Sequence, residues 1–228
     1  MTTDIKPNID AVRSRITDAC RRAGRSENDV RLVAVSKTVP ADVVAQGIDA
    51  GLDILGENYI QEAQAKIEAL GDRASWHFIG RLQSNKAKYA VRLFDLIHSV
   101  DNLKLAQEID KRARGLEKTQ PVLIQVNISG ETTKGGTATD EAAVLIDQVR
   151  ALKNLEPRGL MTMPPFFDQP DRARPFFSGL REIRNKYAPD LPELSMGMSG
   201  DFEVAIEEGA TLVRVGTAIF GARVYAEK

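Results

Sequence analysis

Lys37, Ser199, Gly216 and Thr217 are the residues whose types and positions in the chain suggest chemistry. Each lies directly after a short apolar run: Lys37 after 31–36, Ser199 after 193–196, and Gly216 with Thr217 after 212–215. A neutral lysine amine attacks an aldehyde to form a Schiff base. Hydroxyl groups and the exposed backbone N–H groups of small residues bind phosphate. These residues can act together only if the fold brings the ends of the three runs to one place.

The apolar runs alternate with segments of helical periodicity. An example is the stripe Leu103, Ala106, Ile109 and Ala113. Crossovers of this length require parallel strands. A further helix is expected before the first strand, with a stripe from Val12 to Ala23 that ends at Gly24. Eight strands are predicted, at 31–36, 54–56, 76–80, 96–100, 122–128, 158–161, 193–196 and 212–215.

Eight strand–helix units in 228 residues predict an α/β fold, a single (β/α)8 TIM barrel with an extra N-terminal helix. No linker or change in composition marks a second domain, so residues 1–228 are expected to form one domain. A doubly wound open sheet is the alternative. It is disfavoured because SKTVPAD, rather than a glycine-rich turn, follows the first strand.

Closing a barrel places the eighth strand beside the first, so Lys37 is expected near Arg214 and Gly216. Burial and Arg214 would then lower the pKa of Lys37. TIM barrels frequently bind phosphate between the loops after strands seven and eight, where Ser199, Gly216 and Thr217 lie. The alternatives are a surface lysine, a serine that caps a helix starting near residue 201, and a glycine in a tight bend.

Arg214 and Asn58 each have two readings. Arg214 either donates to a ring nitrogen, which would weaken a pyridine as an electron sink, or forms an ion pair with Glu57 or another strand-end acid. Asn58 either donates to a phenolic oxygen or caps the helix that begins near Tyr59.

The other polar residues near strand ends indicate no metal site. His77 is read as a core histidine or as a base, and His98 has no spaced Cys, His or Asp partner. Glu131 and Lys134 form either a mobile lid or, as we prefer, a solvated turn. The remaining strand-end residues are Arg81, Gln83, Ser84, Asn85, Lys86, Asn127, Met161 to Met163, and Gly200.

Composition excludes several classes of partner. The net charge of -1 gives no field that would attract nucleic acid or an anionic membrane, and no apolar run is long enough to cross a bilayer. The single cysteine, Cys20, has no partner for an internal disulfide, and residues 1–9 do not read as a signal peptide. A cytoplasmic location is therefore expected.

Several stretches, taken together, resemble the YggS/PROSC family of pyridoxal phosphate homeostasis proteins, relatives of the barrel domain of alanine racemase. The resemblance covers almost the whole chain. The stretches are LVAVSK at 32–37, GENYIQEAQAK at 56–66, WHFIGRLQSNK at 76–86, ETTKGG at 131–136, GLMTM at 159–163, LSMGMSGDFEVAI at 194–206 and VRVGTAIFGAR at 213–223.

The resemblance implies pyridoxal 5′-phosphate (PLP) as the cofactor, held as a Schiff base on Lys37. It implies that Ser199, Gly216 and Thr217 hold the phosphate and that Arg214 faces the pyridine nitrogen. The expected function is to hold PLP, limit the free aldehyde and deliver PLP to apoenzymes. The segment TKGG departs from the family pattern and leaves a role for Lys134 in cofactor transfer open.

Two enzymatic alternatives remain at this stage. One is a PLP-dependent amino-acid racemase with Lys37 and His77 as bases, and the other is a Schiff-base aldolase or phosphosugar isomerase. The chain ends a few residues after the eighth strand, without the second domain that helps racemases exclude water and supply a second base. The same missing domain favours a monomer, and the basic surface near Arg181, Arg184 and Lys186 is read as a solvated helix face.

Overall fold

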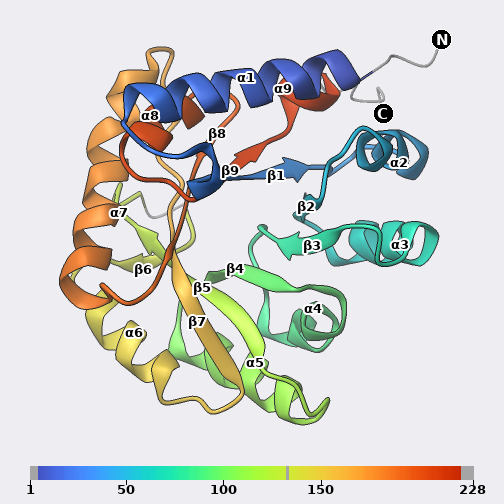
Figure 1. The fold of residues 1–228 in the computed structure, drawn as a ribbon. Coiled ribbons are helices and arrows are strands. Elements are labelled where there is room, and N and C mark those ends of the chain that lie inside the picture. Colours follow the sequence, from blue (N-terminus) through green and yellow to red (C-terminus); the bar gives the residue numbers. More distant parts are fainter. Residues whose placement is uncertain (1–4, 132–133, 222–228) are drawn as a thin grey trace.

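The computed structural model describes residues 5–131 and 134–221, and its strands form a closed parallel barrel (Figure 1). The strands are β1 Arg31–Val35, β2 Ile54–Glu57, β3 Ser75–Phe78, β4 Leu96–Val100, β5 Gln120–Asn127, β6 Thr137–Ala138, β7 Leu155–Met161, β8 Glu193–Met198 and β9 Leu212–Val215. The barrel order is β1-β2-β3-β4-β5-β7-β8-β9, closed by pairing of β9 with β1, while the short β6 pairs with β5 outside this ring. The predicted (β/α)8 barrel is confirmed.

Helices surround the barrel, and α1 lies across α8 and α9 on its outer side (Figure 1). No helix in residues 5–131 and 134–221 is long and apolar enough to cross a membrane. The α-helices are α1 Lys6–Arg22, α2 Ala41–Asp49, α3 Ile60–Leu70, α4 Ala87–Leu93, α5 Leu103–Arg114, α6 Ala142–Arg150, α7 Arg174–Tyr187, α8 Phe202–Glu207 and α9 Thr217–Phe220. Short 3-10 helices occupy Glu27–Asp29, Ser84–Lys86 and Pro170–Ala173.

Each predicted strand overlaps one strand of the barrel, with differences at the ends. β7 begins at Leu155, three residues before the predicted start at Arg158, and it includes Pro157. The register between β5 and β7 shifts beside Pro157, between Val122 and Leu123. An irregularity of this kind accommodates a proline, which has no backbone N–H to donate to a neighbouring strand. The strand β6 was not predicted, because two residues are too few to produce a pattern.

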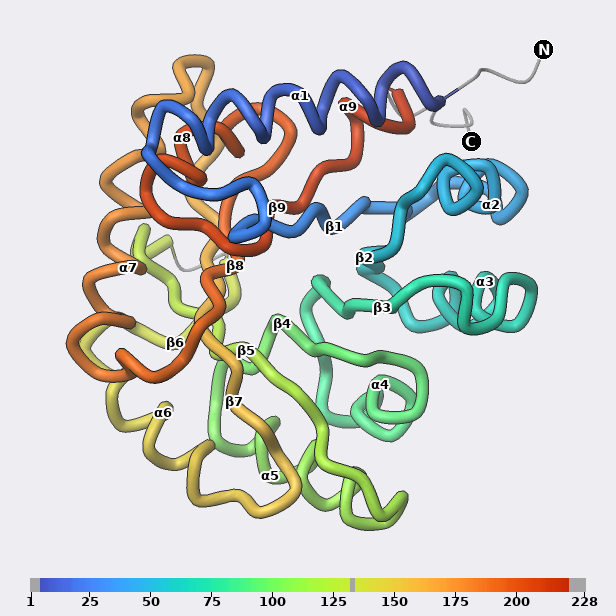
Figure 2. Tube along the Cα trace, viewed as in Figure 1, coloured from blue at the N-terminus to red at the C-terminus, as the bar shows by residue number. Residues whose placement is uncertain are grey.

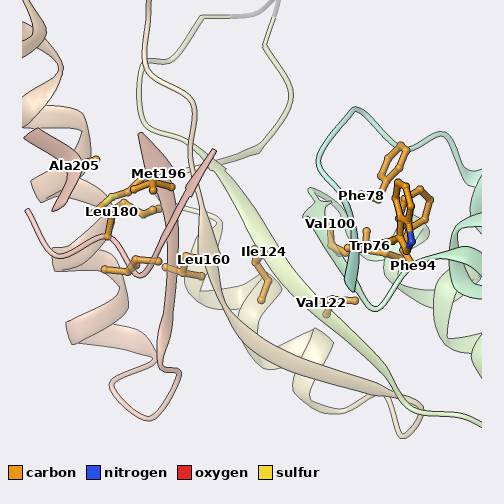
Figure 3. Packing of buried hydrophobic residues seen from close by; sticks show 14 of the residues in the cluster. Trp76, Phe78, Phe94, Val100, Val122, Ile124, Leu160, Leu180, Met196 and Ala205 are labelled. Atoms are coloured by element: carbon orange, nitrogen blue, oxygen red, sulfur yellow. The ribbon is translucent and has the colours of Figure 1, made fainter. Parts of the chain in front are cut away.

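Alternation along the strands divides the side chains between the barrel interior and the layer under the helices. In Figure 3, Trp76, Phe78 and Phe94 gather on one part of this outer layer, and Leu160 and Met196 lie in another part with residues of the helices. Fully burying a large apolar side chain contributes about 1.5–3 kcal/mol. The barrel interior holds a separate small apolar cluster, formed by Val33, Ile54, Leu96, Leu123, Met161 and Leu212.

Candidate functional site

Closure of the barrel brings the loop that carries Lys37 next to the loop after β9. Val33 is opposite Arg214 and Ala34 is opposite Val215 in the parallel ladder, so β1 and β9, which are far apart in the sequence, lie side by side (Figure 2). A Cβ on Gly216 would lie 3.2 Å from the carbonyl oxygen of Val35. Glycine therefore permits the close approach of the two strand ends. Lys37 follows two residues after Val35 and is half-buried.

The loops after β8 and β9 are joined by a hydrogen bond. The backbone N–H of Gly216 donates to Ser199 Oγ at 3.2 Å. The serine hydroxyl can still donate its own proton to a ligand. A Cβ at Gly200 would meet no atom within 4 Å, and the next residue after Gly216, Thr217, is exposed. The Ser199 hydroxyl and the backbone of Gly216 thus meet at the carboxyl end of the barrel, and Thr217 directly follows them in the chain.

Asp201, which was not predicted as a site residue, shapes the loop around Ser199. It is the N-cap of α8, so the alternative in which Ser199 caps this helix is wrong. Its Oδ1 accepts a hydrogen bond from the backbone N–H of Met198 at 2.6 Å. Burial raises the pKa of Asp201, while its bond from Met198 and the charge of Arg214 oppose this rise. The bond between Asp201 and Met198 stabilises the conformation of the loop that carries Ser199.

Arg214 is a buried cation on the inner side of β9. Its Nη1 donates to Ser195 Oγ at 2.6 Å and its Nη2 donates to the carbonyl oxygen of Thr162 at 2.9 Å. No carboxylate in the described part of the chain forms an ion pair with it, so the alternative that pairs it with Glu57 is wrong. Burial lowers the pKa of Arg214 to about 10, which leaves it charged at neutral pH.

Both histidines of the chain continue this network through the barrel interior. His98 Nδ1 lies 2.9 Å from Ser195 Oγ, and His98 Nε2 lies 3.0 Å from His77 Nδ1. Burial lowers the pKa of His77 to about 4 and lowers the pKa of His98 well below its ordinary value. Both rings are therefore neutral at pH 7. His77 is a buried, hydrogen-bonded core histidine, as one of the two sequence readings expected.

Asn58 carries an unsatisfied acceptor at the end of β2. Its Oδ1 is buried and has no hydrogen-bond partner among the described residues. The N-cap of α3 is Tyr59 and has no side-chain capping bond, so the reading of Asn58 as the cap is wrong. A Cβ on Gly80 would lie 2.3 Å from the carbonyl oxygen of Asn58, so the backbone after β3 packs closely against Asn58. Buried polar groups without partners are rare, and a ligand would satisfy this one.

Glu57 belongs to a buried cluster that includes Ser36, the residue before Lys37. Its Oε1 accepts hydrogen bonds from Ser36 Oγ at 2.7 Å and from Lys66 Nζ at 2.6 Å. Burial raises the pKa of Glu57, and the charge of Lys66 opposes that rise. Sequence reasoning missed Lys66 because a lysine nine residues after a strand-end glutamate has the spacing of an ordinary helix-surface residue.

Of the other strand-end residues, Thr162 joins this group through its carbonyl oxygen, which accepts from Arg214. The residues considered next do not join it. Asn127 shapes its own loop, where its Nδ2 donates to the carbonyl oxygen of Glu131 at 2.9 Å. Lys134 Nζ lies 3.0 Å from Glu131 Oε2, in agreement with a turn. Arg81, Gln83 and Asn85 are exposed, and residues 5–131 and 134–221 contain no group of three or more side chains that could hold a metal.

Comparisons with known proteins point to one group. The family model described as "Alanine racemase, N-terminal domain" matches residues 8–224. The chain is 50% identical to the pyridoxal phosphate homeostasis protein of Aquifex aeolicus, over 95% of the chain and 97% of that protein. It is 42% identical to the protein of the same name from Escherichia coli K12, over 99% of both. The solved structure of PipY from Synechococcus elongatus PCC7942 with PLP bound has a TM-score of 0.84 and 35% identity, and the match covers 95% of this chain and all of that one.

Proposed function

This chain belongs to the family of pyridoxal phosphate homeostasis proteins, and from that premise we propose that it binds PLP at the carboxyl end of its barrel as a Schiff base on Lys37. The observation that carries the proposal is the closure of β9 on β1. It sets the Lys37 loop beside the linked Ser199 and Gly216, with Arg214 on the same strand as Gly216.

The residues present fit the chemical groups of PLP. The phosphate requires several donors, and Ser199, Gly216 and Thr217 supply hydroxyl and backbone groups at the point where the two loops meet. The phenolic oxygen suits Asn58, whose Nδ2 amide group can donate a hydrogen bond to it. The buried Oδ1 of Asn58, which has no partner among the described residues, can in turn accept from a donor on the ligand. Arg214 is the charged group for the ring nitrogen, because a guanidinium does not release its proton at neutral pH.

These residues favour storage of PLP over catalysis of a reaction with it. When bound, PLP would supply an aldehyde that combines reversibly with amines, and the Lys37 amine would compete with free amines for it. Arg214 donates without losing its proton, so it leaves the ring nitrogen unprotonated and weakens electron withdrawal by the ring. Ser199, Gly216 and Thr217 orient the phosphate and fix the distance of the aldehyde from Lys37. A carrier of this kind limits the free aldehyde and delivers PLP to apoenzymes.

A titration tests the binding. Adding PLP to the protein should produce a saturable change in visible absorbance with one equivalent bound, and Lys37→Ala should abolish it. The matched control is Lys88→Ala, an exposed lysine on α4. Unchanged binding by Lys37→Ala would remove Lys37 from the proposal. If the parent protein does not change the PLP spectrum, PLP is excluded as its ligand.

Delivery and assembly need separate measurements. The loaded protein should activate an apo PLP-dependent enzyme faster than free PLP does when a PLP-trapping amine is present. Equal rates would exclude direct delivery.

We also propose that the protein is a monomer without nucleic-acid or membrane partners. We propose that it acts in the cytoplasm, because a cofactor carrier must share a compartment with its recipient enzymes. Light scattering and cell fractionation test these points.

A further inference from the structure

The two residues that flank Lys37 are held by side chains of a single helix. Lys66 Nζ donates to the carbonyl oxygen of Ser36 at 2.5 Å, and the backbone N–H of Thr38 donates to Glu62 Oε2 at 2.9 Å. Glu62 and Lys66 are four residues apart on α3, so they project from the same face of that helix. One helix face therefore contacts the chain on both sides of Lys37.

The contact on the Ser36 side is buried and charged. The side chains of Lys66 and Glu57 are 7% and 0% exposed, and they are 2.6 Å apart. Ser36 adds its own hydroxyl bond to Glu57 at 2.7 Å, and its N–H donates to the carbonyl oxygen of Gly56 at 3.0 Å. A buried group with bonds in several directions has little freedom to shift. Ser36 is therefore a fixed anchor.

The contact on the Thr38 side holds an unfavourable backbone conformation. Thr38 has a φ of 64°, in the left-handed region that β-branched residues rarely adopt. Thr38 is exposed, so packing around its side chain does not account for this conformation. Glu62 accepts its N–H, and a strained residue persists only when its surroundings hold it. The turn is closed by its own bond from the Val39 N–H to the Ser36 carbonyl oxygen at 3.0 Å, and the bond to Glu62 of α3 holds it in addition.

We propose that Glu62 and Lys66 are positioning residues that clamp both neighbours of Lys37 and fix the direction of its side chain at the mouth of the barrel. This inference rests on the proposed function, since it assigns the clamp to the lysine that binds PLP. Neither residue needs to touch the cofactor. The clamp also gives a role to the segment GENYIQEAQAK, whose residues 62 and 66 were not explained by cofactor contacts.

The test compares Glu62→Ala with Glu62→Gln. Alanine removes the acceptor for the Thr38 N–H, whereas glutamine keeps an oxygen at the same place. We expect Glu62→Ala to speed amide exchange at Thr38 in the cofactor-free protein and to weaken PLP binding about tenfold, or about 1.4 kcal/mol. Glu62→Gln should stay within about threefold of the parent for both quantities. The matched control is Glu68→Ala on the same helix, where the glutamate binds Gln64 at 2.8 Å.

A second substitution separates positioning from general loss of structure. Glycine adopts positive φ without a steric penalty, so Thr38→Gly in the Glu62→Ala background should recover most of the lost PLP affinity. Urea unfolding of both variants shows whether the recovered affinity accompanies a general gain in stability or a local relief of strain at position 38. A double variant that binds PLP no better than Glu62→Ala contradicts the proposal.

The remaining outcomes are also decisive. Unchanged Thr38 exchange in Glu62→Ala overturns the clamp, and faster exchange with unchanged PLP affinity overturns its positioning role. If the parent itself binds no PLP, the proposed function fails. The exchange measurement, made without cofactor, still decides in that case whether Glu62 holds Thr38.

Discussion

The hydroxyl oxygen of Ser199 accepts a hydrogen bond from the backbone N–H of Gly216 at 3.2 Å, and this bond joins the loops after β8 and β9. The two residues are on different loops, and Gly216 lies against the end of β1. The proposed phosphate site and the Lys37 loop therefore share one structural support.

Ser199→Ala tests the phosphate assignment. Loss of the hydroxyl should weaken PLP binding by about ten- to a hundredfold, because hydrogen bonds to charged groups contribute about 1.5–3 kcal/mol. Binding of pyridoxal, which lacks the phosphate, should change little. Titration of both ligands gives the comparison, with Ser178→Ala on α7 as the control. Equal loss for the two ligands would show that Ser199 does not bind phosphate.

Replacing Lys66 by methionine should destabilise the protein by about 3–5 kcal/mol in urea unfolding, because Glu57 would remain buried without its partner. The double variant Glu57→Gln/Lys66→Met should recover part of this loss. Lys6→Met is the control, since the Lys6–Asp10 pair is exposed and its loss should cost less than about 1 kcal/mol. A small effect at Lys66 would mean that Glu57 is protonated or solvated in the folded protein.

His77 should make stability fall in mild acid. Burial lowers the pKa of His77 to about 4 in the folded protein, against an ordinary value of 6.5. Between these pH values the unfolded chain binds more protons, so the free energy of unfolding falls as the pH falls. The loss attributable to His77 is at most about 3 kcal/mol and is absent above pH 6.5. Urea unfolding at pH 7, 6 and 5 should show a shallower decline for His77→Asn, and parallel declines would refute the assignment.

The interior network predicts specific histidine tautomers. Arg214 donates to Ser195 Oγ, which leaves the serine proton for His98 Nδ1. His98 then carries its proton on Nε2 and donates it to His77 Nδ1. The chain has two histidines, so nitrogen-15 NMR of the labelled rings is unambiguous. Both should be neutral Nε2–H tautomers at pH 7, and Ser195→Ala should shift the Nδ1 resonance of His98. A cationic ring in the parent protein would contradict this network.

Local patterns in the sequence predicted most of the fold and the proximity of Gly216 to the end of β1. Strand-sized apolar runs and long crossovers predict a parallel barrel, and closure alone places the eighth strand beside the first. The contact between Ser195 and His98 could not be predicted, because it depends on which residues of neighbouring strands share a level in the interior. The reading of Glu57 as the partner of Arg214 failed because Glu57 faces the helix layer, where it binds Lys66 of α3, whereas Arg214 faces the barrel interior.

The most direct test of the central claim is borohydride reduction of the PLP-loaded protein, followed by peptide mass mapping. The account predicts a phosphopyridoxyl group on the peptide that contains Lys37 and none in Lys37→Ala. A label on another lysine, such as Lys134, would keep the cofactor and contradict the site, and no label on any lysine would contradict the Schiff base itself.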